Sequence, residues 1–390
     1  MSRLNELIKK LCPEGVPYVP IKELGTLTRG KRFVHADAVS DGIPCIHYGE
    51  LYTYYGLWTN RTKSFVRKEL ANKLRYAQKN DVIIVGAGEN DIDIGIAVAY
   101  LGNVNVAVHD ACYILRQNND PKYISYCLRT NDYHNQIKKY VSTGKICAIS
   151  AEGLGKAKIP VPPLEVQREI VHLLDNFTLL TAELTAELTA RRKQYEYFKR
   201  YLLSLEADAK KLKLLEICDI SRGKVISKDN IRENPGKYPV YSSQTENNGE
   251  LGKISTYMYD GEYLTWTTDG ANAGSIFYRN EKFSITNVCG LLKVIRPEVN
   301  IRYLFHLLTI EAPKYVSRGM GNPKLMSNVI GNIKLNIPSI EIQNKVANIL
   351  DHFDAVCNDI SIGLPAEIAA RQKQYEYYRD KLLTFKELNS

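Results

Sequence analysis

The chain has 390 residues, 44% of them hydrophobic, which is enough for two or three domains with cores of their own. Lys and Arg outnumber Asp and Glu by 52 to 43, and the formal charge of +9 suits a polyanionic partner without proving one. No apolar run approaches the roughly 18 residues of a bilayer crossing, no signal-peptide core opens the chain, and the eight cysteines form no Cys-x-x-Cys pair. We therefore expect a cytoplasmic protein with reduced thiols, no membrane partner and no metal site.

A first globular unit is expected over residues 1–160. Sequence-specific DNA binding requires polar side chains that reach base edges, while phosphate contacts hold the frame. Basic and aromatic residues are interleaved in this segment, which suits such a surface; the alternative is a tyrosine-rich strand with ordinary packing. The candidate DNA-contacting residues are Arg29, Lys31, Arg32, His47, Tyr48, Tyr52, Tyr54, Trp58, Arg61, Lys63 and Lys145.

A long helix is predicted over residues 161–207. Apolar residues recur there at spacings of three and four, and prolines 162 and 163 suit the first turn of a helix. The tetrapeptide Thr-Ala-Glu-Leu occurs twice in succession, which places one leucine per turn on one face. One such unit is about 6 Å of helix, so its number predicts the length of a spacer. The spacer residues are Thr181, Leu184, Thr185 and Leu188.

A second globular unit is expected over residues 208–337. Its polar loops are rich in amides and hydroxyls, and Asn and Gln can read adenine through two hydrogen bonds. The alternative is that these glycine-containing loops are ordinary turns. The candidate DNA-contacting residues are Arg222, Lys224, Tyr241, Ser242, Ser243, Gln244, Asn247, Asn248, Thr268, Asn272, Arg318, Asn322 and Lys324.

The last segment, residues 338–390, repeats the predicted helix. Gln167 and Asp175 recur 176 positions later as Gln343 and Asp351. The run Lys-Gln-Tyr-Glu-Tyr recurs 180 positions after its first copy, so the second helical segment carries four extra residues. The repeat indicates two long helices that pair with each other in antiparallel fashion, as a coiled coil with a pseudo-twofold relation between the halves.

The charge follows the same division. Residues 1–160 carry 22 basic and 15 acidic groups, and residues 208–337 carry 18 and 13. The helical segments 161–207 and 338–390 have net charges of −1 and −2. The positive charge therefore lies on the globular halves, where a DNA-binding surface needs it.

Motifs for catalysis are absent or incomplete. Residues 25–31 fit Gly-x-x-x-x-Gly-Lys, but Arg32 follows where a phosphate-binding loop needs Ser or Thr for magnesium. The stretch at 86–91 fails the dinucleotide-binding pattern, and the Asn/Asp-Pro-Pro-Tyr/Phe motif of adenine methyltransferases does not occur. Asp91 and Asp93 are better explained as turn or surface residues than as metal ligands. We therefore expect a chain that is not itself an enzyme.

The two helical segments resemble the specificity subunits of type I restriction–modification systems. The resemblance is carried by KIPVPPLEVQREIVHLLDNFTLLTAELTAELTARRKQYEYFKR and GLPAEIAARQKQYEYYRDKLLTF, and the doubled Thr-Ala-Glu-Leu unit is similar to the IC subgroup. The globular halves match the family mainly in position and in their Arg-Gly-Lys turns. The resemblance implies an α+β fold in which two target-recognition domains are separated by two long antiparallel helices.

The resemblance also implies partners and a division of labour. The chain would bind double-stranded DNA and two modification subunits, which hold S-adenosylmethionine and methylate adenine, and restriction subunits that use ATP and magnesium would join where the system cuts DNA. This chain would bind no cofactor. Because the two halves differ in sequence, we expect an asymmetric target in two parts. Two alternatives stay open: a self-contained DNA methyltransferase, and a structural coiled-coil adaptor without a role on DNA.

Overall fold

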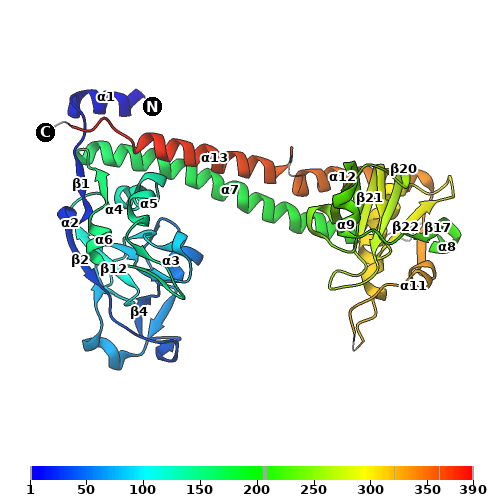
Figure 1. The fold of residues 1–390 in the computed structure, drawn as a ribbon, viewed down its shortest axis with the longest axis horizontal. Coiled ribbons are helices and arrows are strands. Elements are labelled where there is room, and N and C mark those ends of the chain that lie inside the picture. Colours follow the sequence, from blue (N-terminus) through cyan, green and yellow to red (C-terminus); the bar gives the residue numbers. More distant parts are fainter. Residues whose placement is uncertain (1, 205–208, 320, 360, 389–390) are drawn as a thin grey trace. The chain divides into compact units, whose positions relative to one another are not determined.

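The computed structural model describes residues 2–204, 209–319, 321–359 and 361–388 (Figure 1). The contacts divide the chain into two compact units. The N-terminal unit holds the residues up to Glu183 together with those from Ile368 onward, and the C-terminal unit is Leu184–Glu367. Each unit therefore contains part of both helical segments. Within the described ranges, no helix is long and apolar enough to cross a membrane.

The N-terminal unit is built on a five-stranded sheet with the order β2-β12-β8-β10-β5. Its strands β8 and β10 are apolar and buried throughout, and α4 packs on them. These elements are β2 (Gly25–Arg29), β12 (Cys112–Gln117), β8 (Val82–Val85), β10 (Ala97–Tyr100), β5 (Trp58–Thr59) and α4 (Pro121–Cys127).

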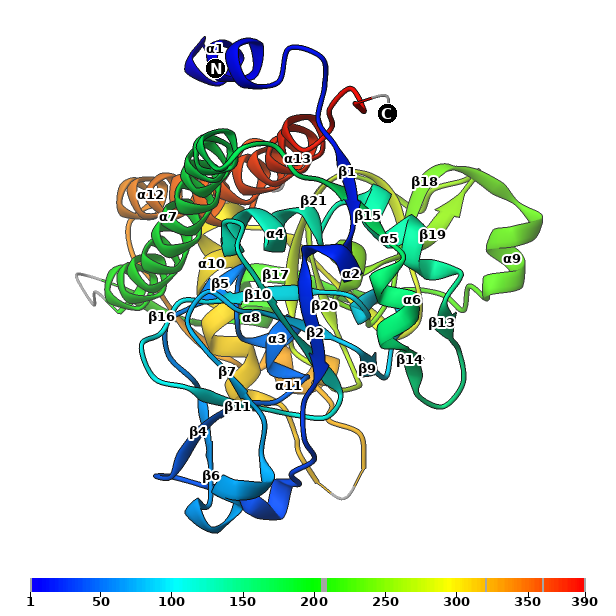
Figure 2. The ribbon, with the colours of Figure 1, turned by 90° about the vertical axis from the view of Figure 1, so that its left-hand side faces the viewer.

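A second sheet of the N-terminal unit has a small core of its own, made by Phe33, Cys45, Val66 and Ala107. Figures 1 and 2 show its strands β4 and β6 on the side of the unit away from α7. Its order is β3 (Ala38–Val39), β6 (Ser64–Val66), β4 (Ile43–Ile46), β11 (Val106–Val108) and β7 (Tyr76–Ala77). The remaining elements of the unit are α1 (Ser2–Leu11), β1 (Tyr18–Pro20), α2 (Ile21–Leu24), η1 (His35–Asp37), α3 (Glu50–Thr53), η2 (Lys68–Lys73), β9 (Ala87–Gly88), η3 (Asp91–Asp93), α5 (Asn131–Lys138), β13 (Val141–Ser142), β14 (Cys147–Ile149), α6 (Ala151–Gly155) and β15 (Lys158–Pro160).

The C-terminal unit is built on a six-stranded sheet with the order β17-β22-β20-β21-β18-β19. The helix α10 packs on β20 and β21 from one side and on α12 from the other. The sheet strands are β17 (Cys218–Arg222), β22 (Cys289–Val294), β20 (Tyr259–Thr267), β21 (Ile276–Ile285), β18 (Pro235–Tyr241) and β19 (Glu250–Ile254). The other elements are β16 (Lys210–Lys213), α8 (Leu214–Ile217), α9 (Lys228–Glu233), η4 (Glu246–Gly249), α10 (Ile301–Glu311), η5 (Ala312–Tyr315), α11 (Ser327–Gly331) and β23 (Lys334–Ile337).

The turn after the first sheet strand is the same in both units. Gly30 follows β2 and Gly223 follows β17, so the Arg-Gly-Lys matches of the sequence are structural equivalents. A methyl group on Gly30 would lie 2.2 Å from the His109 carbonyl oxygen, and one on Gly223 would lie 2.0 Å from that of Ile285. Glycine is required at both positions because the backbone of the turn runs against another segment.

The first helical segment forms one continuous helix, α7 (Leu164–Leu203), whereas the second forms two, α12 (Ile340–Asn358) and α13 (Leu364–Leu382). The sequence pattern predicted a single helix for the second segment as well. The break coincides with Gly363, where a methyl group would lie 2.5 Å from the Ala355 carbonyl oxygen, and with Pro365 in the first turn of α13. The four extra residues of the second repeat thus belong to a helix break.

The predicted antiparallel pairing of the helices is confirmed within the C-terminal unit. Tyr195 and Phe198 of α7 stack on Phe353 of α12, with ring centroids 6.3 and 5.9 Å apart. Arg192 donates a hydrogen bond to the carbonyl oxygen of Cys357 over 3.4 Å. The partner number falls as the α7 number rises, so the two helices run in opposite directions.

The same helix α7 also pairs within the N-terminal unit, there with α13. Phe177 stacks on Tyr378, with ring centroids 5.4 Å apart and planes within 19°. The helical segments are therefore exchanged. The Lys-Gln-Tyr-Glu-Tyr run of α7 lies in the C-terminal unit, although it follows the N-terminal one in sequence, and the run of α13 lies in the N-terminal unit.

Candidate nucleic-acid interface

Four predicted segments of the C-terminal unit meet at one cluster of loops. The turn at Lys224 pairs with Thr286, whose hydroxyl donates to the Ser242 hydroxyl over 3.0 Å. The Asn272 amide donates to the Thr245 hydroxyl over 2.9 Å. The last segment joins through the β-bridge of Lys324 with Asp269, while a second bridge, of Lys324 with Ser317, lies within that segment. We call these segments, residues 222–224, 241–249, 267–274, 317–319 and 321–324, the C-terminal loop cluster.

Exposure separates the side chains of the C-terminal loop cluster into two groups. Tyr241 and Thr268 are only 4% and 0% exposed, so their side chains lie beneath the loops and not on the surface. The Thr268 hydroxyl donates to the Val288 carbonyl oxygen over 2.9 Å, and the Tyr241 hydroxyl donates to Glu281 over 2.5 Å. The half-buried residues are Ser242, Ser243 and Gln244, and the exposed residues are Arg222, Lys224, Asn247, Asn248, Asn272, Arg318, Asn322 and Lys324.

In the N-terminal unit, a cluster of rings lies beside the turn that carries Lys31 and Arg32. The rings of His47 and His109 lie 4.4 Å apart, and Tyr48 lies 5.6 Å from His109. The turn is held from below, since the Lys31 amide donates to the Val108 carbonyl oxygen over 2.9 Å. The cluster continues to Phe33 and Tyr52, which lie 5.0 Å from His109 and 6.4 Å from Tyr48. We call the following residues the N-terminal ring cluster: Arg29, Lys31, Arg32, Phe33, His47, Tyr48, Tyr52 and His109.

The imidazoles of the N-terminal ring cluster are poor proton acceptors. Burial lowers the pKa of His47, and burial together with the neighbouring His47 lowers the pKa of His109. Both rings are therefore neutral at pH 7, and the positive charge at this surface comes from the exposed Arg29, Lys31 and Arg32. Sequence reasoning missed His109, which is isolated in sequence and reaches the cluster only through the pairing of β11 with β4.

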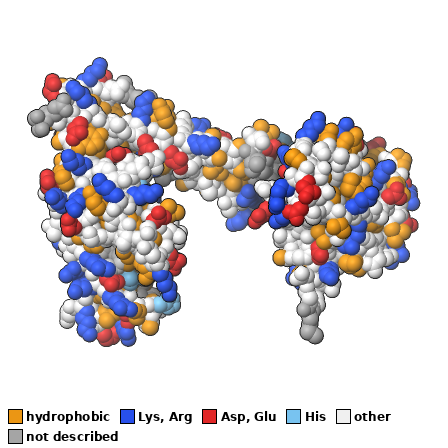
Figure 3. Space-filling view, viewed as in Figure 1, with side chains coloured by type: hydrophobic (Ala, Val, Ile, Leu, Met, Phe, Trp, Pro, Cys, Tyr) orange, Lys and Arg blue, Asp and Glu red, His pale blue; other side chains and the backbone are white. Residues whose placement is uncertain are grey.

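The other predicted residues of the N-terminal unit lie outside the ring cluster. The Lys63 ammonium lies 4.9 Å from the Tyr54 ring, so these two side chains form a pair. Trp58 lies on β5, at the opposite edge of the sheet from β2, and its ring is 4.5 Å from the Lys122 ammonium. Arg61 and Lys145 are exposed in loops. Figure 3 shows Lys and Arg side chains gathered over the part of this unit that carries β4.

Both units attach to the helices through the same buried glutamine. The Gln167 side chain accepts from the Asp120 amide over 2.9 Å and donates to the Pro162 carbonyl oxygen over 2.8 Å. The Gln343 side chain accepts from the Asn300 amide and donates to the Pro338 carbonyl oxygen, both over 2.8 Å. Both glutamines are at most 1% exposed. Each one ties the start of a helical segment to the residue that caps α4 or α10.

A repeated aspartate forms the second contact of this joint. Asp175 accepts from the Lys122 ammonium over 2.6 Å and from the Tyr126 hydroxyl over 2.8 Å. Asp351 accepts from the Arg302 guanidinium over 2.6 Å and contacts Nε2 of His306 over 2.7 Å. These pairs are equivalent positions of the repeat. In both units an aspartate of the helical segment contacts two side chains of the globular part, and only the types of those two side chains differ. These contacts hold the globular part of each unit on its helices.

The comparisons with known proteins agree with this architecture. Residues 13–191 and 206–370 match the family model described as type I restriction modification DNA specificity domain. The chain belongs to this family.

Among relatives, the putative type I specificity subunit S.MpnORF615P of Mycoplasma pneumoniae is 45% identical over 58% of this chain and 92% of its own length. S.MpnORF201P of the same organism is 44% identical over 59% of this chain and 97% of its own length. The specificity subunit of Mycoplasma genitalium has the same fold, with a TM-score of 0.60 over 95% of this chain and 96% of its own, at 16% identity. A chain from a study of assembly of the type I system aligns with a TM-score of 0.64 over 96% and 98%, also at 16% identity.

The specificity subunit is the DNA-recognising component of its system and is not catalytic. Among the described residues, no group of three or more His, Cys, Asp or Glu side chains could hold a metal ion. The clusters of the two units instead offer amides, hydroxyls, guanidinium groups and rings, which recognise bases and phosphates.

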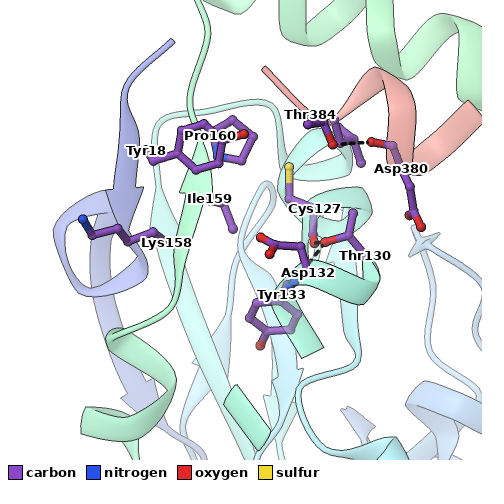
Figure 4. Close-up of a pocket in the computed structure, with 11 residues that line it drawn as sticks. Tyr18, Cys127, Thr130, Asp132, Tyr133, Lys158, Ile159, Pro160, Asp380 and Thr384 are labelled. Carbon is purple, nitrogen blue, oxygen red and sulfur yellow. Dashed lines mark hydrogen bonds between the residues drawn. The ribbon is translucent and has the colours of Figure 1, made fainter. Parts of the chain in front are cut away.

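A cavity of about 330 Å³ lies in the N-terminal unit, beside the end of α13. Figure 4 shows its lining residues converging from α4, α5, β15 and the end of α13. Asp380 is fixed there, because its carboxylate accepts from the Asn131 amide over 3.1 Å and its carbonyl oxygen accepts from the Thr384 hydroxyl over 2.7 Å. The lining holds no residue predicted to contact DNA.

Proposed function

We propose that each unit reads one half of an asymmetric, two-part DNA target. The observation that carries this proposal is the repeated joint, in which Gln167 and Asp175 on one side and Gln343 and Asp351 on the other hold two unlike units in the same way. The repeated joint attaches both units to the helices in the same way, and each unit carries one of the two clusters. Their side chains differ, so the two half-sites differ as well.

We further propose that the helices set the spacer between the half-sites. The helix α7 runs without a break from the N-terminal unit into the C-terminal unit. The doubled Thr-Ala-Glu-Leu tetrapeptide lies at the boundary between these two units. Leu184 is half-buried, and Leu188 packs against the core of the C-terminal unit. Adding or removing one Thr-Ala-Glu-Leu tetrapeptide moves this packing along the helix by about one helical turn.

The helices also dock two modification subunits in this proposal. The same exposed face recurs in the two copies of the Lys-Gln-Tyr-Glu-Tyr run, where Tyr197 is 66% and Tyr377 is 60% exposed. Tyr201 extends the first face, stacked on Tyr197 with planes 2° apart. Exposed aromatic side chains on a shallow surface are typical anchors of protein interfaces. Two like faces in one chain fit two copies of one partner.

The partner subunits supply the chemistry in this proposal. S-adenosylmethionine belongs to the modification subunits, ATP and magnesium belong to restriction subunits, and this chain contributes recognition alone. We propose that the complex works in the cytoplasm, as the sequence predicted. The target is double-stranded DNA, and phosphate contacts from the basic side chains make its binding weaken steeply with salt.

Deletion of residues 185–188 tests the spacer. The variant lacks one helical repeat of about 6 Å, which equals one to two base pairs at about 3.4 Å each. In complex with the modification subunits, it is expected to methylate sites whose half-sites are unchanged and whose spacer is shorter by that amount. Sequencing of methyladenine in the genome of a host that carries the complex gives both quantities at once.

A matched control keeps the length of α7 constant. Replacement of residues 185–188 by four alanines retains the helix and is expected to retain the wild-type spacer. A deletion variant that still methylates the wild-type sites, or that changes a half-site sequence, contradicts the spacer role.

A further inference from the structure

Arg279 on β21 is a buried cation at the base of the C-terminal loop cluster. Its side chain is 2% exposed, and its guanidinium carbon lies 3.4 Å from the centroid of the Tyr241 ring. Nη2 donates to the Asn248 carbonyl oxygen over 2.7 Å, and Nε donates to the Thr265 hydroxyl over 3.2 Å. Nη1 is buried and has no hydrogen-bond partner among the described residues. The guanidinium therefore contacts the loop cluster from inside the unit.

The turn above Arg279 has an unusual backbone. Asn247, Asn248 and Gly249 are three successive residues in the left-handed region, with φ angles of 47°, 55° and 83°. This region is costly for residues other than glycine, although asparagine tolerates it better than most. A turn of this kind persists only where its surroundings hold it. The hydrogen bond from Arg279 to the Asn248 carbonyl oxygen is such a contact.

The packing between the turn and Arg279 is close. A methyl group on Gly249 would lie 3.1 Å from the Gln244 carbonyl oxygen and 3.2 Å from Nη2 of Arg279. The Ser242 amide donates to the Gly249 carbonyl oxygen over 3.0 Å, and the Gln244 amide donates to Glu250. The guanidinium thus fills the inside of the turn, while the Asn247 and Asn248 side chains are exposed on the outside.

Stability alone does not explain an arginine at this position. A buried cation loses its hydration, and apolar residues of similar volume often stabilise a core equally well or better. What an apolar side chain lacks is the planar set of donors that fixes a carbonyl oxygen while it stacks on a ring. The feature that requires arginine is therefore the conformation of the turn.

We propose that Arg279 is a positioning residue for DNA recognition, which holds residues 244–249 in the one conformation that presents Asn247 and Asn248 to the DNA. This inference rests on the proposed function, because it takes the C-terminal loop cluster as the reader of one half-site. Arg279 itself does not touch DNA. Its loss should therefore change which bases are accepted at that half-site, while the affinity for phosphates stays largely intact.

The test compares Arg279→Met and Arg279→Lys in the complete complex with modification subunits. Binding is measured for duplexes with the intact target and with single-base changes in either half-site. For Arg279→Met, discrimination at the half-site of the C-terminal unit is expected to fall at least tenfold, with no change at the other half-site. Arg279→Lys keeps the charge without the planar donors and is expected to lose discrimination to a smaller extent.

Gly249→Ala reaches the same turn without removing the buried cation, so it decides the question if Arg279→Met does not fold. Its added methyl group presses on Nη2 at a positive φ, and the same selective loss is expected. Gly261→Ala is the matched control, because Gly261 also has a positive φ, of 115°, but a methyl group there meets only the Tyr263 ring, at 4.0 Å. This control is expected to keep full discrimination.

The outcomes separate the inference from the proposed function. Unchanged discrimination in folded Arg279→Met and Gly249→Ala overturns the positioning role, and so does an equal loss at both half-sites, which indicates general destabilisation. A wild-type complex that discriminates at neither half-site refutes the proposed function itself. Selective loss at one half-site in both variants, with Gly261→Ala unaffected, supports the role of Arg279.

Discussion

His306 illustrates how a single residue of the joint can depend on its surroundings. It lies on α10, is completely buried, and contacts Asp351 of α12 through Nε2 over 2.7 Å. Burial lowers its pKa to about 4, although Asp351 opposes the effect. The folded protein thus keeps a neutral imidazole where an unfolded chain has a histidine with a pKa near 6.5. The equivalent position of the N-terminal unit is Tyr126, whose hydroxyl makes the same contact with Asp175.

The first prediction concerns this histidine and pH. Between pH 6.5 and 4 the unfolded chain binds a proton that the folded chain excludes, so the histidine makes the free energy of unfolding decrease as pH falls. His306→Gln removes this contribution. Between pH 7.5 and 5, its free energy of unfolding should decrease by about 2 kcal/mol less than that of the wild type, as one proton is worth about 1.4 kcal/mol per pH unit.

Urea unfolding at the two pH values measures the difference. His172→Gln replaces an exposed histidine of α7 and serves as the control. An equal pH dependence in wild type and His306→Gln rules out the buried neutral histidine as its source.

The helices explain how two units can share one scaffold. Each unit contains part of α7 and one of the two helices α12 and α13. The N-terminal unit therefore takes its second helix from the far end of the chain. Aromatic residues mark both contacts, at Phe177 with Tyr378 and at Phe198 with Phe353. Because the rings of each pair face one another, the outward faces of the helices are left for other partners.

The second prediction concerns those outward faces. Tyr197→Ser and Tyr377→Ser each remove one exposed aromatic anchor. Each single variant is expected to bind one modification subunit normally and the other at least tenfold more weakly. Aromatic hot spots of protein interfaces commonly contribute about 2 kcal/mol or more, and about 1.4 kcal/mol corresponds to a tenfold change in affinity. The double variant should lose both. Native mass spectrometry of the complexes counts the bound subunits.

Tyr257→Ser is the control for this pair, because Tyr257 is an exposed tyrosine, at 44%, outside the helices. It should leave the subunit count unchanged. Two modification subunits on the double variant, bound as tightly as on the wild type, would falsify the docking role of these faces.

At the scale of the whole molecule, the repeat separates what the two units share from what they do not. The joint through Gln167 and Gln343 is shared. The sheets differ, because the N-terminal unit adds the strands β3, β6, β4, β11 and β7 whereas the C-terminal unit extends its main sheet to six strands. The differences thus lie in the parts that carry the two clusters, away from the contacts with the helices.

The third prediction follows from this division. Replacement of residues 1–160 by the corresponding unit of another family member should change one half-site of the methylated sequence and leave the other half-site and the spacer intact. The exchanged unit must keep a side chain that can pair with Asp175, as Lys122 does here. Methyladenine sequencing reads the outcome, and a change in both half-sites argues against independent reading.

Much of this organisation could be predicted from the sequence. The helices follow from the spacing of apolar residues, and the repeat and the antiparallel pairing follow from identities such as Gln167 with Gln343, which a comparison of the sequence with itself reveals. The positions of the two Arg-Gly-Lys turns were predicted for the same reason. DNA contact by the individual candidate residues stays a prediction.

Only the tertiary structure decided which side chains share a surface and which are buried. Tyr241 and Thr268 look like members of exposed polar loops in the sequence, yet they lie inside the unit, and Arg279 beneath them gave no signal at all. The exchange of the helices and the break at Gly363 were likewise not predicted. Burial and pairing depend on segments far apart in the chain, so no local pattern encodes them, whereas helix periodicity is set by neighbours three and four residues away.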